Sequence, residues 1–328
     1  MTKAVLRDVT VEVTNRCQLR CRACAIWKER SRREISASRF IRLTESLLRN
    51  YQVRFISVTG GEPFLHPGIG GVLRFLALMR SRGLVTGYGV YTNGACTARI
   101  QRLFKSQGRM FNGIEVGVSV DGDEQAHDAL RGKGAYRKTM KTLEFLAGEC
   151  RDSVKLELKF TINRVNYHAL GEVYRLARRF GARFSPKIME YGVAAYYHRS
   201  GGPGVQALSS LTALMRSSVR AQVLDILHGG AEGIDRAMAE AVLHLLDSGR
   251  KGISACATPK NSLFITSGGD VHPCLYMPPV GCVDLKGGLP DGLDLQRGVM
   301  FRSAKKGDCP GCFAYHGFLK PFNLRYLA

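Results

Sequence analysis

Ten cysteines are the side chains of this sequence best suited to chemistry, and eight of them lie near its two ends. Three form the spacing Cys17-x3-Cys21-x2-Cys24. Thiolates this close together can hold one iron–sulfur cluster and leave its fourth iron open, because soft sulfur ligands favour Fe–S clusters or zinc. A zinc site with a remote fourth ligand would use the same residues, as would buried structural thiols. A disulfide scaffold is disfavoured, since such scaffolds are usually short secreted chains and this one has 328 residues.

A second motif, Gly60-Gly61-Glu62-Pro63, follows a β-rich run. Paired glycines let the backbone approach a ligand closely and present its amide and carbonyl groups. The Glu62 carboxylate can face a cationic group. A plain Gly-Pro turn is the alternative interpretation.

A third group of cysteines lies toward the C-terminal end. Twelve residues separate Cys256 from Gly269, four separate Gly269 from Cys274, and 34 separate Cys274 from Cys309-Pro310-Gly311-Cys312. Gly311 between two cysteines lets backbone amides turn toward the sulfurs, which stabilises a negatively charged cluster. A zinc ion held by four cysteines is the alternative. Cys282 could serve as a fifth thiol, but we expect a free or buried side chain there, and packing positions for Cys96 and Cys150.

The segments that carry these motifs alternate between strand and helix. Strand patterns occur at 9–13, 54–59, 85–92, 114–120, 154–162 and 184–189, and helical patterns at 36–51, 70–82, 97–106, near 140–146 and at 170–180. Six strand–helix repeats predict a parallel sheet, either doubly wound or curved into a partial barrel. In both, function collects in the loops that follow the strands. The cysteine triplet, the 60–63 motif, Asn93 and the 119–122 segment all lie in such loops.

The rest of the chain divides into two parts. The glycine-rich stretch 200–204 predicts a flexible break, and 205–246 predicts helices interrupted at Gly229-Gly230. From residue 255 onward the chain is rich in glycine, proline and cysteine, as in small loop-rich units that need a metal to fold. We therefore expect a core at 1–200, a helical linker at 201–254 and a cysteine-rich subdomain at 255–328.

Three motifs resemble, in order and spacing, the signatures of the radical S-adenosylmethionine (SAM) superfamily over roughly residues 5–190: Cys17-x3-Cys21-x2-Cys24, Gly60-Gly61-Glu62-Pro63 and Ser119-Val120-Asp121-Gly122, the last with His127-Asp128 and Arg131-Gly132 downstream. The resemblance implies an α/β fold, a partial (β/α)6 TIM-like barrel. It also implies a 4Fe–4S cluster on the three N-terminal cysteines. The open iron would chelate SAM, and one electron would cleave SAM to methionine and a 5′-deoxyadenosyl radical that abstracts a substrate hydrogen.

The resemblance also names the residues expected to contact SAM, which are Gly60, Gly61, Glu62, Asn93, Ser119 and Arg131. The first three would hold the methionine amino group, and Asn93 and Ser119 would face SAM from strand ends. Arg131 would neutralise the SAM carboxylate through a charge-assisted contact. A solvated surface arginine is the alternative for that residue.

One position departs from the family pattern. The residue before the third cysteine is usually aromatic in the family and lies near the adenine, but here it is Ala23. Trp27, the only tryptophan, would either cover the cofactor in its place or pack in the core.

The C-terminal cysteine spacing resembles the twitch subdomain, the single-cluster relative of the SPASM extension found on many radical SAM enzymes. This resemblance implies an auxiliary 4Fe–4S cluster held by Cys256, Cys274, Cys309 and Cys312. A full SPASM extension needs more cysteines after Cys312, and the sequence has none. Four protein ligands would leave no open iron, which favours electron transfer over direct binding of substrate.

The charge of the chain bears on its partners. Lys and Arg total 48 against 27 Asp and Glu, for a net charge of +21. Lys28, Arg30, Arg32 and Arg33 crowd the stretch after the cysteines, where they could meet an acidic electron donor such as flavodoxin or ferredoxin, or an anionic substrate. No aromatic-interleaved RNA-binding pattern occurs, which disfavours nucleic acid as a partner.

No apolar run is long enough to span a membrane and no signal peptide is evident, so we expect a cytoplasmic protein without a membrane partner.

We expect an oxidoreductase-like radical SAM enzyme that oxidises or rearranges a small polar substrate, such as a sugar, aminosugar or nucleoside. The second hypothesis is a maturase of a ribosomal peptide or protein, which is disfavoured because no leader-peptide-binding module precedes the first strand. The third is a non-catalytic zinc or Fe–S protein. The pattern identifies no catalytic base, although Glu190, Tyr191, Asp270 and His272 are conceivable at the barrel mouth.

Overall fold

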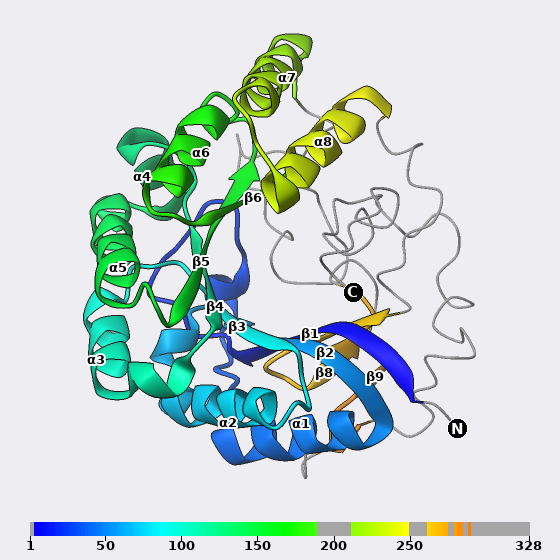
Figure 1. The fold of residues 1–328 in the computed structure, drawn as a ribbon. Helices are drawn as coiled ribbons and strands as arrows, with labels where there is room; N and C mark the ends of the chain where they lie inside the picture. Colours follow the sequence, from blue (N-terminus) through cyan, green and yellow to red (C-terminus); the bar gives the residue numbers. More distant parts are fainter. Residues whose placement is uncertain (1–2, 189–210, 249–260, 275–278, 285–287, 290–328) are drawn as a thin grey trace.

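The computed structural model describes residues 3–188, 211–248, 261–274, 279–284 and 288–289. Their strands form one nine-stranded sheet in the order β6-β5-β4-β3-β2-β1-β7-β8-β9 (Figure 1). The first six are parallel and follow chain order: β1 (Ala4–Thr14), β2 (Tyr51–Gly60), β3 (Gly87–Thr92), β4 (Ile114–Ser119), β5 (Val154–Ile162) and β6 (Arg183–Ile188). This arrangement is the partial TIM-like barrel that the family resemblance implies.

Helices follow the strands and cover the outer face of the curved sheet (Figure 1). They are α1 (Ala37–Asn50), α2 (Ile69–Ser81), α3 (Thr97–Gln107), α4 (Glu124–Arg131), α5 (Ala135–Glu149) and α6 (Leu170–Arg179). The helix α1 illustrates why they form: the Ser36 side chain caps its first turn, and Phe40, Leu43 and Leu47 recur at helical spacing and are fully buried. In β1 the alternate residues Val9 and Val11 join the same core.

Two parts of this region differ from the sequence-based prediction. The strand β1 begins at Ala4 rather than at residue 9, and the helix α4 was not predicted. An eight-residue helix shows too few turns for a clear periodicity; its N-terminus is fixed by Asp123, whose side chain accepts a hydrogen bond from the Ala126 amide.

The helical prediction for 205–246, with its interruption, is confirmed for the part that the structure describes, which begins at residue 211. The helices α7 (Ala213–His228) and α8 (Gly233–Ser248) are separated by a turn in which Gly230 has a φ of +82°. The carboxylate of Asp235 in α8 accepts a hydrogen bond from the Phe184 amide of β6 at 3.0 Å, so this pair of helices is attached to the last barrel strand.

The sheet continues on the other side of β1 with three short strands. These strands come from residues after 255, where the sequence predicts the C-terminal subdomain. The strand β7 (Ser262–Ile265) pairs parallel to β1, and β8 (Asp270–His272) and β9 (Gly281–Cys282) add antiparallel strands. The division into three parts stays a prediction. Cys256, Cys309, Cys312, Glu190 and Tyr191 lie outside the described residues. Within the described ranges, no helix is both long and apolar enough to cross a membrane.

Candidate functional site

The three N-terminal cysteines lie on a loop between β1 and α1 that is closed at its base. The Asn15 amide donates to the Arg33 carbonyl at 3.1 Å and the Ile35 amide to the Val13 carbonyl at 2.9 Å. The Asn15 side chain completes the closure, because it donates to the Ser31 carbonyl at 2.7 Å and accepts from the Arg33 amide at 2.9 Å. These contacts fix both ends of the segment that carries the thiols.

All three thiols of this loop are half-buried. Burial raises the pKa of Cys17 and of Cys24 to about 12 and also raises the pKa of Cys21, with the neighbouring thiols adding to the rise at Cys17 and Cys24. In the described ranges no three His, Cys, Asp or Glu side chains lie close enough to share one metal ion. A cubane cluster differs from a single metal ion in this respect, because each protein thiolate binds a different iron of the cluster.

The paired glycines lie where the loop after β2 crosses the end of β1. A Cβ atom on Gly60 would lie 2.4 Å from the Thr14 carbonyl oxygen, and one on Gly61 would lie 2.4 Å from that of Arg16. The amides of Gly61 and Glu62 donate to these same two carbonyls at 2.8 and 2.7 Å. The glycines therefore permit a close approach between the two loops of the site, a role that the sequence motif alone does not reveal.

The Glu62 carboxylate is fully buried and joins the ends of β2 and β3. It accepts hydrogen bonds from the Thr92 hydroxyl at 2.8 Å, the Asn93 amide at 2.9 Å and the Phe64 amide at 3.2 Å. Burial nevertheless raises its pKa to about 7. With three donors bound, this side chain clamps the ends of β2 and β3 together.

Two further side chains that the motifs do not reveal hold this region together. Gln18 donates to the Asn93 side-chain oxygen at 3.1 Å, while the Asn93 amide group lies 3.6 Å from the Cys17 sulfur. His66 is buried, with Nε2 3.0 Å from the Ile35 carbonyl and Nδ1 accepting from the Gly68 amide at 3.1 Å. His66 thereby connects the loop after β2 to the base of the cysteine loop.

The unpredicted helix α4 supports the cysteine loop from the other side. The Arg22 amide donates to the Leu130 carbonyl at 2.8 Å, and Ala23 packs against the Leu130 side chain. The indole N–H of Trp27 donates to the Cys21 carbonyl at 3.1 Å. The small Ala23 thus fits an apolar contact with α4, and Trp27 is half-buried against the backbone of a cysteine rather than enclosed in the core.

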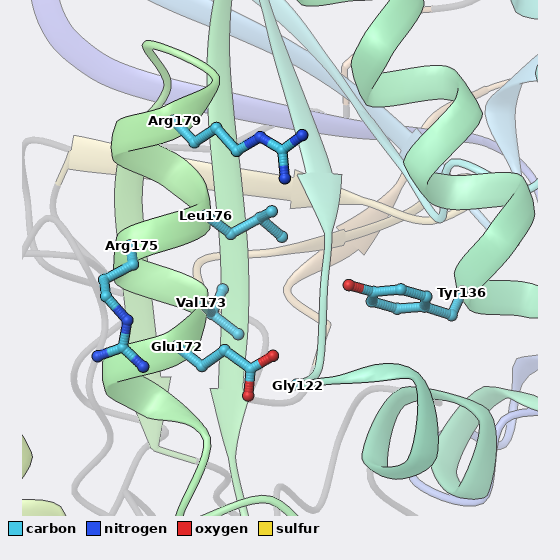
Figure 2. Close-up of a pocket in the computed structure, with 7 residues that line it drawn as sticks. All are labelled: Gly122, Tyr136, Glu172, Val173, Arg175, Leu176 and Arg179. Atoms are coloured by element: carbon cyan, nitrogen blue, oxygen red, sulfur yellow. The ribbon is translucent and has the colours of Figure 1, made fainter.

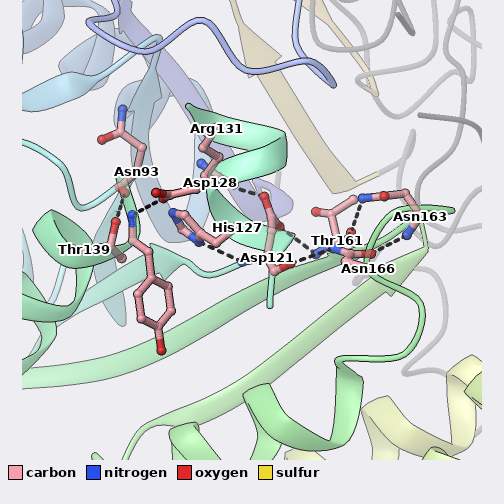
Figure 3. A network of polar contacts seen from close by, with 10 residues as sticks. Asn93, Asp121, His127, Asp128, Arg131, Thr139, Thr161, Asn163 and Asn166 are labelled. Atoms are coloured by element: carbon pink, nitrogen blue, oxygen red, sulfur yellow. Dashed lines mark hydrogen bonds and ion pairs between the residues drawn. The ribbon is translucent and has the colours of Figure 1, made fainter. Parts of the chain in front are cut away.

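Arg131, at the end of α4, is held by Asp121 in the polar network of Figure 3. Its Nε donates to the Asp121 carboxylate at 2.6 Å, and its side chain is only 14% exposed, which rules out the solvated alternative. Burial acts to lower the pKa of Arg131, but the charges of Asp121 and Cys21 outweigh it and raise the pKa. The guanidinium therefore carries a fixed positive charge beside the cysteines.

The same network contains a buried neutral histidine. The Nδ1 atom of His127 accepts a hydrogen bond from the Asp121 amide at 3.2 Å, and its ring meets the Tyr136 ring edge-on. Burial and then the Arg131 charge lower the pKa of His127 to about 4, although Asp121 and Asp128 oppose the shift.

This histidine should make the fold sensitive to acid. Because its folded pKa lies below the unfolded value, the unfolded state binds more protons between the two values, and stability is lost as the pH falls from about 6.5 toward 4. Between pH 7 and 5 the loss from His127 is expected to be about 2 kcal/mol. Urea unfolding of the iron-free protein at both pH values measures it. His127→Asn, which keeps an acceptor at the Nδ1 position, should lose less stability on acidification; equal losses would contradict the assignment.

Ser119 ends β4 on the face of the sheet opposite the helices, and its register partner is Lys159 on β5. The Lys159 ammonium lies 4.2 Å from the centre of the Tyr91 ring and 3.1 Å from Glu157. Arg183 lies 3.3 Å from the same carboxylate. The interior of the barrel therefore carries a charged cluster below the candidate site, which no local motif marks in the sequence.

Two of the C-terminal cysteines lie among the described residues near β8 and β9. Cys282 lies opposite Asp270 in the register of these strands, and Cys274 follows the end of β8 after a bend. Cys282 is exposed and lies close to Gly269, and its role as a free thiol stays a prediction. Of the conceivable bases, Asp270 accepts from the Thr266 hydroxyl at 3.2 Å and His272 is buried beside Phe264.

A groove on the outer side of the barrel lies apart from the cysteine loop. Figure 2 shows Tyr136, from the start of α5, across from Glu172 and Arg179 of α6, while Arg175 extends from the far side of that helix. Tyr136 also contacts His127, so the groove adjoins the polar network that contains His127. None of the predicted site residues lines it.

The fold and the cysteine loop define a partial β/α barrel with a thiol-rich site at the carboxyl ends of its strands. Residues 11–168 match the radical SAM superfamily, and the chain carries a radical SAM domain. The "Antilisterial bacteriocin subtilosin biosynthesis protein AlbA" of Bacillus subtilis is 23% identical over 82% of the chain, and "Mycofactocin maturase MftC" of Mycobacterium tuberculosis is 25% identical over 82%. The chain spans 55% and 64%, respectively, of these two relatives.

Solved structures agree with the fold. Streptococcus suis SuiB superposes with a TM-score of 0.63 at 16% identity, over 96% of this chain and 72% of SuiB. SuiB bound to its precursor peptide SuiA gives a TM-score of 0.62 at 17% identity, over 94% and 70% of the two chains. At such identities the likeness establishes the fold alone. The names of the relatives favour the peptide hypothesis over the small polar substrate that we expected first.

Proposed function

We propose that Cys17, Cys21 and Cys24 hold a 4Fe–4S cluster and that the protein is an enzyme that cleaves SAM reductively. When bound, the cluster supplies the electron that converts SAM to methionine and a 5′-deoxyadenosyl radical. The observation that carries the proposal is the fixed set of three half-buried thiols, on a loop closed by Asn15, with the charge of Arg131 beside them. That cation stabilises thiolates, which neutral burial alone would disfavour.

The chain's own residues prepare the site for SAM. The close crossing at Gly60 and Gly61 places the C-terminal end of β2 against the start of the cysteine loop. Glu62 then holds this end of β2 to the end of β3. Asn93 and Ser119 stand at neighbouring strand ends, as a cofactor lying across the barrel requires. Arg131 is oriented by Asp121, so it can neutralise the carboxylate of SAM without reorganising.

We further propose that the substrate is a ribosomally made peptide, so that the protein is a maturase. The relatives named for bacteriocin biosynthesis and maturation support this choice. An auxiliary 4Fe–4S cluster on Cys256, Cys274, Cys309 and Cys312 would accept an electron if the reaction is an oxidation. The twitch-like spacing of these residues is its support.

Anaerobic reconstitution tests both the proposed SAM cleavage and the proposed peptide substrate. With SAM and dithionite the protein should form 5′-deoxyadenosine, and iron analysis should find about eight irons per chain for two cubane clusters. Adding a candidate precursor peptide should accelerate 5′-deoxyadenosine formation and change the mass of the peptide, whereas sugars and nucleosides should do neither. Zinc without iron would refute the enzyme assignment, and acceleration by a sugar alone would refute the peptide assignment.

A further inference from the structure

The cysteine loop is also the most basic stretch of the protein around the candidate site. Seven of the 18 residues at 16–33 are Arg or Lys, and one, Glu29, is acidic. Six of the cations are exposed, and five of them define what we call the basic face: Arg20, Arg22, Lys28, Arg30 and Arg32. Arg33 is not included, because its guanidinium lies against Gly268 in the turn after β7.

The backbone that carries the basic face is held in place at its C-terminal end. Asn15 binds the backbone of Ser31 and Arg33, on either side of Arg32. The short helix η1 (Ile26–Lys28) presents Trp27 and Lys28 together, with the Lys28 ammonium 5.4 Å from the centre of the indole ring. A fixed array of like charges produces a directed field that attracts an acidic partner and raises its rate of association.

Trp27 joins this surface to a candidate cluster ligand. Its half-buried ring lies beneath Lys28, and its N–H donates to the carbonyl of Cys21 at 3.1 Å. One hydrogen bond and the short side chain of Cys21 therefore separate the indole from the thiol. No such aromatic connection was evident from the sequence, where cofactor cover and core packing were the two interpretations.

We propose that the basic face is the docking surface for an acidic one-electron-donor protein, and that the electron enters through Trp27. This inference rests on the proposed function. In the step itself, a reduced flavin hydroquinone of the donor loses one electron and becomes a semiquinone, and the cluster held by Cys17, Cys21 and Cys24 gains that electron. No bond forms or breaks. An acidic substrate peptide is the competing occupant, but a substrate must reach the barrel interior, whereas these cations share the loop with the cysteines themselves.

The test uses the reconstituted full-length enzyme and flavodoxin as the probe. Arg30→Glu/Arg32→Glu reverses two charges that make no polar contact with other described residues. The Kd of this variant for flavodoxin should be higher than that of the unmodified enzyme by on the order of tenfold at low ionic strength. The difference between the two Kd values should shrink with added salt. Stopped-flow absorbance should show slower cluster reduction by flavodoxin hydroquinone, while 5′-deoxyadenosine formation driven by dithionite stays unchanged. Trp27→Phe should keep the affinity but slow the reduction severalfold.

The matched control is Arg102→Glu/Arg109→Glu, which makes the same change in net charge at exposed positions of α3 and η3 (Gly108–Phe111). If the Kd for flavodoxin rose equally in this control variant, the proposed docking surface would be refuted, because only the net charge of the protein would then matter. An unchanged Kd in Arg30→Glu/Arg32→Glu would also overturn it. So would a basic face that binds an acidic peptide but not flavodoxin. Failure of the proposed function is distinct, because the unmodified enzyme would then form no 5′-deoxyadenosine with dithionite.

Discussion

Cys21→Ala is expected to reduce 5′-deoxyadenosine formation to the level measured without protein and to remove about four irons per chain. Cys21 is the central thiol of the loop and the one most directly faced by Arg131. Two remaining thiolates cannot hold a cubane that needs three protein ligands to leave one open iron. Iron and sulfide analysis together with chromatography of the SAM products measures both effects.

Cys96→Ala is the matched control, because Cys96 is also half-buried but packs against the core at the start of α3. It should keep its iron and its SAM cleavage. The free energy of unfolding of the iron-free Cys21→Ala protein should equal that of the unmodified protein, because no side-chain hydrogen bond of Cys21 contributes to the described fold. Full iron content in Cys21→Ala would contradict the assignment of the ligands.

The order of parallel strands and helices could be predicted because these elements obey simple periods, whereas the choice of a barrel over a doubly wound sheet came from the family resemblance. Burial at alternate positions in β5, with Val154, Leu156 and Leu158 on one face, matches the predicted strand at 154–162. The strands β7 to β9 could not be foreseen, because they are only two to four residues long. Their place beside β1 is decided by tertiary contacts, such as the pairing of Thr10 with Phe264.

In the candidate site, too, some features could be predicted from the sequence and others could not. Spacing identified the three cysteines, since their chemistry depends on residues close together in the chain. Spacing could not reveal that His66 braces the cysteine loop from 31 residues away, or that Asp121 rather than solvent meets Arg131. It suggested that the paired glycines approach a ligand, but not that they also approach the backbone of β1 and of the loop after it. Contacts between distant segments leave no periodic signal.

Gly61→Ala is expected to reduce both stability and SAM cleavage severely. The new Cβ would lie 2.4 Å from the Arg16 carbonyl oxygen and 2.7 Å from that of Asn15, and backbone atoms on a closed loop cannot rotate away. The loop after β2 must then retreat, which weakens the hydrogen bonds from Gly61 and Glu62. Overpacking alone should lower the free energy of unfolding by about 1–3 kcal/mol. Urea unfolding of the iron-free protein measures this loss.

The functional loss should exceed what the stability loss explains. Arg16 directly precedes Cys17, so displacing its backbone should move a cluster ligand and lower the iron content and the SAM affinity of protein that is still folded. Gly148→Ala is the control: this exposed glycine of α5 has no atom within 4 Å of its new Cβ, and the exchange should raise helix stability by about 0.5–1 kcal/mol. A Gly61→Ala protein that is less stable but fully loaded and active would mean that the close crossing supports only the fold. Unchanged stability would show that the two loops can separate freely, and the glycines would then have to be explained by a ligand after all.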